Sequence, residues 1–131
     1  MPVVSLLNDR EAGAEALAVF DDIRAKRQTD YVNNFWRALA HDPATLKATW
    51  DRAQAVMAPG VLDPLVKELI YVAVSTANGC DYCVHSHTAA AKAKGMTPAM
   101  HGELLAVIAM ASQTNALATA LSIPVDERFK A

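Results

Sequence analysis

Residues 68–87 read ELIYVAVSTANGCDYCVHSH, and this stretch contains both cysteines of the 131-residue chain. Cys80 and Cys83 form one Cys-x-x-Cys motif. His87 follows the second cysteine by four residues, and Glu68 precedes the first by twelve. On a helix, residues three or four apart share a face, so the two sulfurs can meet and the imidazole lies one turn from Cys83. The motif therefore predicts thiol chemistry, in which the cysteines alternate between dithiol and disulfide.

A glycine within the same stretch predicts how the glutamate reaches the histidine. Gly79, preceded by Asn78, indicates a break between two helices, because glycine readily adopts the left-handed conformation that ends helices. Glu68 lies eleven residues before this glycine and His87 lies eight after it. If the helices form an antiparallel hairpin, a rise of about 1.5 Å per residue brings the two side chains to a similar depth. We therefore expect glutamate, histidine and thiol to be linked.

This order of groups suits a nucleophile, a base and an orienting acid. A free cysteine titrates at about 8.5 and only its thiolate attacks a peroxide or a disulfide, so a base must promote ionisation. His87, oriented by Glu68, can be that base. Glu68 has apolar neighbours along its helix, so we expect a partly buried carboxyl; without a partner its pKa would rise, as suits a proton shuttle. After attack, the sulfenic acid condenses with the second thiol, and an outside partner reduces the disulfide.

Glu68, the Cys80-Asp81-Tyr82-Cys83 motif and His87, at these spacings, resemble the alkylhydroperoxidase D-like, peroxidase-related branch of the carboxymuconolactone decarboxylase superfamily. The resemblance covers about residues 31–121 of the chain, including residues 36–43 and the Lys94-Gly95 pair that follows the cysteine helix. It implies an all-helical domain that forms oligomers and a disulfide-forming peroxidase cycle. In that cycle Cys83 is the attacking thiol and Cys80 resolves the intermediate. Glu68 and His87 would then form the proton relay.

The sequence departs from the resemblance at Tyr82, where the best studied members carry a further histidine. We expect Tyr82 to pack over the thiols or to contact substrate. The order of attack is a second difference. The helix dipole would favour attack by Cys80, which lies nearest the helix N-terminus, but that dipole contributes only about 0.3–1 kcal/mol. His87 is one turn from Cys83 and two from Cys80, so we follow the resemblance and assign the attack to Cys83.

Other interpretations of the motif lead to different functions. The cysteines could be a structural pair, or they could bind zinc with His87 and Glu68, although structural zinc usually draws on a second Cys or His cluster that the chain lacks. A carboxymuconolactone decarboxylase-like enzyme would use Glu68 and His87 as acid and base and would need no thiol. A redox-sensing module would oxidise once without peroxidase turnover. Our leading prediction is an alkyl hydroperoxide reductase or thiol-disulfide oxidoreductase with no bound cofactor and no metal.

Composition limits the class of protein and its partners. The length fits a single domain over residues 1–131, and a 53% apolar share leaves a surplus that predicts a buried interface in a homo-oligomer. The formal net charge of −2 has no basic cluster, so we expect neither nucleic acid nor membrane as a partner. We predict a cytoplasmic protein. In the reducing cytoplasm a Cys-x-x-Cys motif is usually catalytic or metal-binding. Its partners would be an organic hydroperoxide or a protein disulfide, and an external dithiol reductant.

Helical signals run along the whole chain, and no segment alternates as a strand does. Asp42-Pro43, Asp63-Pro64 and Thr97-Pro98 each place a capping side chain before a proline that suits the first helical position. Residues 1–28 read as an N-terminal helix ahead of a core at residues 31–121. We therefore predict an all-α fold of about six to seven helices, with the Cys-x-x-Cys at the start of a central helix. The expected helices lie near residues 9–27, 30–40, 43–57, 63–78, 81–94, 97–112 and 113–121.

Overall fold

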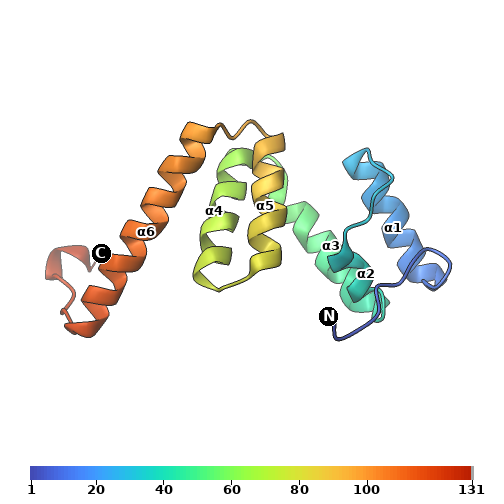
Figure 1. The fold of residues 1–131 in the computed structure, drawn as a ribbon, viewed down its shortest axis with the longest axis horizontal. Helices are drawn as coiled ribbons and strands as arrows, with labels where there is room; N and C mark the ends of the chain where they lie inside the picture. The colour runs from blue at the N-terminus through green and yellow to red at the C-terminus, as the bar shows by residue number, and fades with distance from the viewer. Residues whose placement is uncertain (131) are drawn as a thin grey trace. The chain divides into compact units, whose positions relative to one another are not determined.

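The computed structural model describes residues 1–130, and over that range it contains six α-helices and one short 3-10 helix (Figure 1). The fold is all-α, as predicted. Two compact units are present, Met1–Ala58 and the part from Pro59 onward. The assignment of residues 1–131 to one domain stays a prediction. The helices are α1 (Ala14–Arg27), α2 (Asn34–Leu39), α3 (Pro43–Met57), α4 (Pro64–Ala77), α5 (Asp81–Ala93) and α6 (Pro98–Ala120).

The first unit has an aromatic core formed by α1, α2 and α3. Trp36 and Trp50 meet edge to face with ring centroids 5.3 Å apart. Trp50 is fully buried, and its indole N–H donates to Asp22 Oδ2 at 2.7 Å, so the buried polar atom has a partner. Phe20 on α1 is also fully buried. This unit therefore contains most of the buried apolar side chains of the chain.

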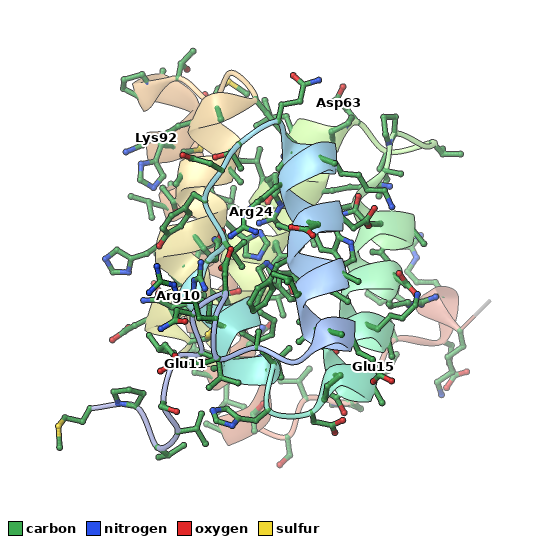
Figure 2. The ribbon with its side chains drawn as sticks, turned by 90° about the vertical axis from the view of Figure 1, so that its right-hand side faces the viewer. Arg10, Glu11, Glu15, Arg24, Asp63 and Lys92 are labelled. Atoms are coloured by element: carbon green, nitrogen blue, oxygen red, sulfur yellow. A yellow bond between two sulfur atoms is a disulfide. The ribbon has the colours of Figure 1, made fainter. Side chains whose placement is uncertain are left out.

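α1 begins later than predicted, at Ala14 instead of near residue 9. The Asn8 side chain accepts hydrogen bonds from the backbone N–H groups of Arg10 (2.9 Å) and Glu11 (3.1 Å). Such local side-chain bonds favour a turn over a helix. Arg24, which projects from α1 in Figure 2, binds Asp9 in this turn at 2.6 Å. The turn thus packs against the helix and does not extend it.

The three predicted helix starts are confirmed. Asp42 accepts from the Thr45 N–H at 3.3 Å, and Asp63 accepts from the Leu65 N–H at 2.8 Å. Thr97 accepts from the Met100 N–H at 3.1 Å. In each case a proline follows in the first turn of the helix. These caps fix the starts of α3, α4 and α6.

α4 and α5 form the hairpin that the glycine predicted, and they lie side by side in Figure 1. Gly79 has a φ of 69°, in the left-handed region, where glycine carries no steric penalty. The Cys80 N–H donates to the Ser75 carbonyl at 2.9 Å, which closes the end of α4. The cysteines therefore follow a tightly hydrogen-bonded turn.

α6 corrects the prediction of two helices at residues 97–112 and 113–121. A single helix runs from Pro98 to Ala120. Residues 112–115 are polar, but no glycine or proline occurs between Gly102 and Pro124. Since polar residues lower helix propensity by far less than proline does, the helix continues through them. It ends before Ser122, whose φ is 48°.

We predict that Gly79→Ala and Gly102→Ala change stability in opposite directions. Neither added methyl group would meet an atom within 4 Å, so backbone conformation alone decides the effect. At Gly79 the left-handed φ should cost about 1–2 kcal/mol. Gly102 lies within α6, where alanine should stabilise by up to about 1 kcal/mol. Urea unfolding at fixed protein concentration measures both, and equal destabilisation would contradict this account of the turn.

Candidate active site

The two cysteines lie at the N-terminus of α5 and form a disulfide. Cys80 is the N-cap residue, and Cys83 lies in the first turn of the helix. Their Cα atoms are 5.3 Å apart, within the usual range for a disulfide. The Cys83 N–H donates to Cys80 Sγ at 3.2 Å, so the first sulfur takes the place of a capping oxygen. The predicted position of the motif at the start of a helix is confirmed.

Glu68 and His87 meet across the hairpin, as their spacing predicted. Glu68 Oε2 lies 2.7 Å from His87 Nδ1. The Glu68 side chain is only 5% exposed, and the imidazole is 24% exposed. The expected burial of the carboxyl is therefore confirmed and is nearly complete. Carboxylate and imidazole lie on the helix pair that positions the disulfide.

A third polar group, which the sequence did not suggest for the site, completes the pairing. Lys94, at the C-terminal end of α5, donates from Nζ to Glu68 Oε1 at 2.8 Å. Both carboxylate oxygens of Glu68 are thus occupied, one by an imidazole and one by an ammonium group. Lys94 is separated from His87 by seven residues, so a helical reading places both on one stripe. That spacing was the signal that could have identified Lys94.

The partners of Glu68 reverse the pKa direction expected for a carboxyl buried without a partner. Burial is the largest single influence and by itself raises the pKa of Glu68. The hydrogen bonds from His87 and Lys94, together with their charges, lower the pKa more than burial raises it. The net result is a pKa below the ordinary value of 4.5. Glu68 is therefore a charged acceptor at neutral pH.

Two aromatic rings lie beside these groups, and a second histidine does not join them. Tyr71 on α4 stacks on His87, with ring centroids 3.5 Å apart and an interplanar angle of 17°. Tyr82 is 44% exposed on the first turn of α5, so its ring is accessible beside the disulfide. His85 is exposed and bonds through Nδ1 to the Asp81 carbonyl at 2.8 Å. Tyr71 therefore limits how the imidazole can turn.

Other parts of the described chain contain no cysteine, which thiol chemistry needs. Within residues 1–130, no three His, Cys, Asp or Glu side chains come together as metal ligands do. A hollow of about 880 Å³ between α1 and α3 is lined by no cysteine or histidine. None of the helices described has the length and apolarity needed to cross a bilayer. The α4–α5 hairpin combines both cysteines with the Glu68–His87 pair.

Comparison with known proteins identifies the class. The Carboxymuconolactone decarboxylase family matches residues 43–126, which include α4, α5 and α6. The chain belongs to this family, and the predicted resemblance is confirmed. It is also similar to the alkylhydroperoxidase AhpD core from Rhodospirillum rubrum, at 62% identity and a TM-score of 0.97. That crystal structure matches over 100% of this chain and 98% of its own. No curated protein sequence matches the chain.

We predict that Glu68→Gln lowers stability in a pH-dependent way. Because the folded pKa of Glu68 lies below its ordinary value of 4.5, the charged carboxylate stabilises the fold above that pH. This contribution is lost as the pH falls through the lowered pKa. At neutral pH the substitution should cost about 1.5–3 kcal/mol, as for hydrogen bonds to a charged group. Urea unfolding measures the free energy of unfolding of both proteins at neutral pH and at several pH values below 4.5. The difference between the wild-type and Glu68→Gln proteins should become smaller as the pH falls.

A matched substitution on an exposed helix face controls for the loss of a charge. Glu15→Gln, in the exposed first turn of α1 and labelled in Figure 2, should change stability by at most about 1 kcal/mol, the usual contribution of an acid at a helix N-terminus. A Glu68→Gln protein whose deficit stays constant from neutral to acid pH would show that the carboxylate charge does not contribute.

Proposed function

We propose that the protein is a cysteine-based alkyl hydroperoxide reductase that cycles Cys80 and Cys83 between dithiol and disulfide. The observation that carries the proposal is the 2.7 Å contact between Glu68 on α4 and His87 on α5, the helix that begins at the disulfide. A carboxylate, an imidazole and a redox pair are the groups such a cycle needs. The similarity to the alkylhydroperoxidase AhpD core supports the same chemistry.

The first step forms a sulfenic acid on Cys83. His87 removes the proton from the Cys83 thiol, one turn away on α5, and Glu68 stabilises the resulting imidazolium. The thiolate attacks the terminal oxygen of an organic hydroperoxide, so an S–O bond forms as the O–O bond breaks. His87 returns the proton to the leaving alkoxide, which departs as an alcohol. The sulfur loses two electrons and the peroxide gains them.

The second step forms the disulfide. Cys80 attacks the Cys83 sulfenic sulfur, and water leaves with the hydroxyl oxygen and the Cys80 proton. The Cys83 N–H that donates to Cys80 Sγ stabilises negative charge on this sulfur, which suits it as the resolving thiolate. An external dithiol then exchanges with the disulfide, supplying two electrons and two protons. The enzyme is reset without a bound cofactor.

Access to the disulfide suits an organic substrate or a partner dithiol. Tyr82, 44% exposed beside Cys83, offers an apolar face to a hydroperoxide or to a partner protein. A protein disulfide could be attacked by the same thiolate, so thiol-disulfide exchange is part of the proposal. Turnover requires a supply of dithiol, so a location in the reducing cytoplasm is part of the proposal.

We predict that Cys83→Ser abolishes hydroperoxide turnover and that Cys80→Ser separates the two steps. With excess dithiol, the wild-type protein should consume many equivalents of cumene hydroperoxide. When dithiol is withheld, it should lose both free thiols together. Cys83→Ser should consume none, because the attacking sulfur is absent. When dithiol is withheld, Cys80→Ser should consume one equivalent and stop at the sulfenic acid, because it has no resolving thiol. Free-thiol counting and peroxide assay of the reduced proteins measure these outcomes.

The same assay distinguishes the alternatives. Full activity in Cys83→Ser would reject the assignment, and a reversed result for the two serine variants would make Cys80 the attacking thiol. Consumption that ends at one equivalent despite dithiol would indicate a redox sensor. The family match favours one further candidate, an acid–base enzyme that uses Glu68 and His87. Its activity would survive loss of both thiols.

The proposed assembly is a homo-oligomer formed through α6. This helix has no buried residue, and it contains one charged residue, Glu103, among 23. Its apolar side chains occur around the whole helix, and a helix of this kind is normally buried. Exposed apolar surface of this extent marks an interface. A second copy of the chain suits it because its own α6 needs the same cover. Leu105, Val107, Met110 and Leu117 are each at least half exposed.

We predict that Val107→Glu reduces the assembly to a smaller species. Val107 is 66% exposed, so a charge there should leave the isolated fold intact but should be costly inside an interface. Size-exclusion chromatography with light scattering measures the mass. Ala25→Glu on the exposed surface of α1 adds the same charge elsewhere and should leave the mass unchanged. Equal masses for the wild-type and Val107→Glu proteins would exclude this surface as the interface.

A further inference from the structure

Lys94 makes a buried contact that the proposed cycle does not use. Its Nζ lies 2.8 Å from Glu68 Oε1, while Glu68 Oε2 is bonded to His87. The lysine side chain is 39% exposed and the carboxyl only 5%. The ammonium group therefore reaches inward from the surface to a nearly buried anion. A lysine that only provided solubility would leave its charge in water.

The backbone holds Lys94 in place for this contact. Lys94 is the C-cap residue of α5, and its N–H donates to the carbonyls of Ala90 and Ala91, both at 3.1 Å. Gly95 follows with a φ of 101°, and the buried Met96 donates its N–H to the Ala91 carbonyl at 2.9 Å. These bonds end the helix directly after Lys94. The backbone position of Lys94 is thus fixed by hydrogen bonds. Its positive charge also interacts favourably with the C-terminus of α5.

The second contact of Glu68 determines what the imidazole can do. An ionised carboxylate only accepts hydrogen bonds, so His87 must donate to it through Nδ1. The other ring nitrogen, Nε2, then has the lone pair that can accept a proton. If Glu68 were protonated, it could donate to Nδ1 instead, and the tautomer with a basic Nε2 would lose its preference. The charge state of one buried carboxyl thus decides which nitrogen is the base.

We propose that Lys94 is a positioning residue of the site: its ammonium group keeps the Glu68 carboxylate charged and oriented, and so keeps Nε2 of His87 available as the base. The significance of this role for catalysis rests on the proposed function. The charge state of Glu68 and the tautomer of His87 do not, because they can be measured without any substrate.

The charged surroundings of Glu68 are few, which makes the effect of Lys94 measurable. The two charged partners that act on the carboxyl are His87 and Lys94, both from α5. On α4, Tyr71 stacks on the imidazole, and Lys67 is the charged residue that precedes Glu68 in sequence. Within the described residues, α6 supplies no hydrogen bond or ion pair to Glu68. Loss of Lys94 would therefore leave burial opposed by His87 alone.

The test compares Lys94→Met, Lys94→Arg and a matched control, Lys92→Met, in the reduced full-length protein. Lys92 lies two residues earlier on α5, is exposed, and projects away from the helix in Figure 2. Carbon-13 NMR follows the Glu68 carboxyl across the acid range, assigned with Glu68→Gln. The rate of thiol alkylation by iodoacetamide, measured over the same pH values, reports how well the base works.

We predict that Lys94→Met raises the midpoint of the Glu68 titration by about one pH unit or more. The pH at which the alkylation rate falls on the acid side should also rise, because Glu68 is protonated, and Nε2 of His87 loses its role as the base, at a higher pH. Lys94→Arg should restore both midpoints, since arginine keeps the charge, and Lys92→Met should match the wild-type protein. Where Lys94→Met does not fold, Lys94→Gln replaces it with a smaller change in polarity.

Three results would overturn the inference. The first is an unchanged Glu68 titration in Lys94→Met. The second is a loss of alkylation rate by the same factor at every pH, which a purely structural role would produce. The third is an equal shift in Lys92→Met. A shifted titration in a protein that shows no peroxide turnover would keep the inference and reject the proposed function, so the two failures are distinguishable.

Discussion

The carboxylate of Glu68 is the constraint on which the arrangement of the α4–α5 hairpin depends. Burial of an ionised carboxyl without partners costs several kcal/mol, and a buried ion must be paired and hydrogen-bonded to be tolerated. Glu68 is on α4, and both of its partners, His87 and Lys94, are on α5. They lie on the same stripe of α5, two turns apart. Only one register of the hairpin satisfies both oxygens at once, so the ion group fixes how the two helices align.

The disulfide depends on the turn that precedes it more than on this ion group. The left-handed Gly79 and the hydrogen bond from Cys80 to the Ser75 carbonyl end α4 and begin the next helix. The cap position of Cys80 then directs its sulfur toward the first turn, where Cys83 lies. A short tight turn thus places the cysteine pair at one end of α5. His87, the proposed base, follows one turn further along the same helix, where it contacts Glu68 of α4. The two parts of the site meet because one helix carries both.

Local signals in the sequence predicted more of this structure than long-range ones did. The three capped starts, such as Asp63-Pro64, and the break at Gly79 were predictable because the residue and its hydrogen-bond partner are close in sequence. The pairing of Glu68 with His87 followed from helical geometry once the turn was known. Lys94 was missed because a long flexible side chain can point outward or inward, and only the buried anion on another helix decides between them. Because the sequence did not show whether Lys94 would contact Glu68, a raised pKa of Glu68 could be predicted only for a carboxyl without a partner. The split of α6 was wrong because polar residues weaken a helix without ending it.

The separate origins of the two parts explain how one scaffold can carry more than one chemistry. A carboxylate that holds an imidazole in one tautomer is a proton-transfer device, and it needs no sulfur to work. Such a device fits a family named for a decarboxylase as well as it fits the alkylhydroperoxidase core to which the chain is similar. In the proposed function, the two sulfurs at the N-terminus of α5 would add a store of two electrons to this proton-transfer pair. Neither part gives hydroperoxide reduction alone: sulfur without the base is a slow nucleophile, and the base without sulfur has no electrons to give. The proposed redox function therefore depends on the helix that joins Cys83 to His87.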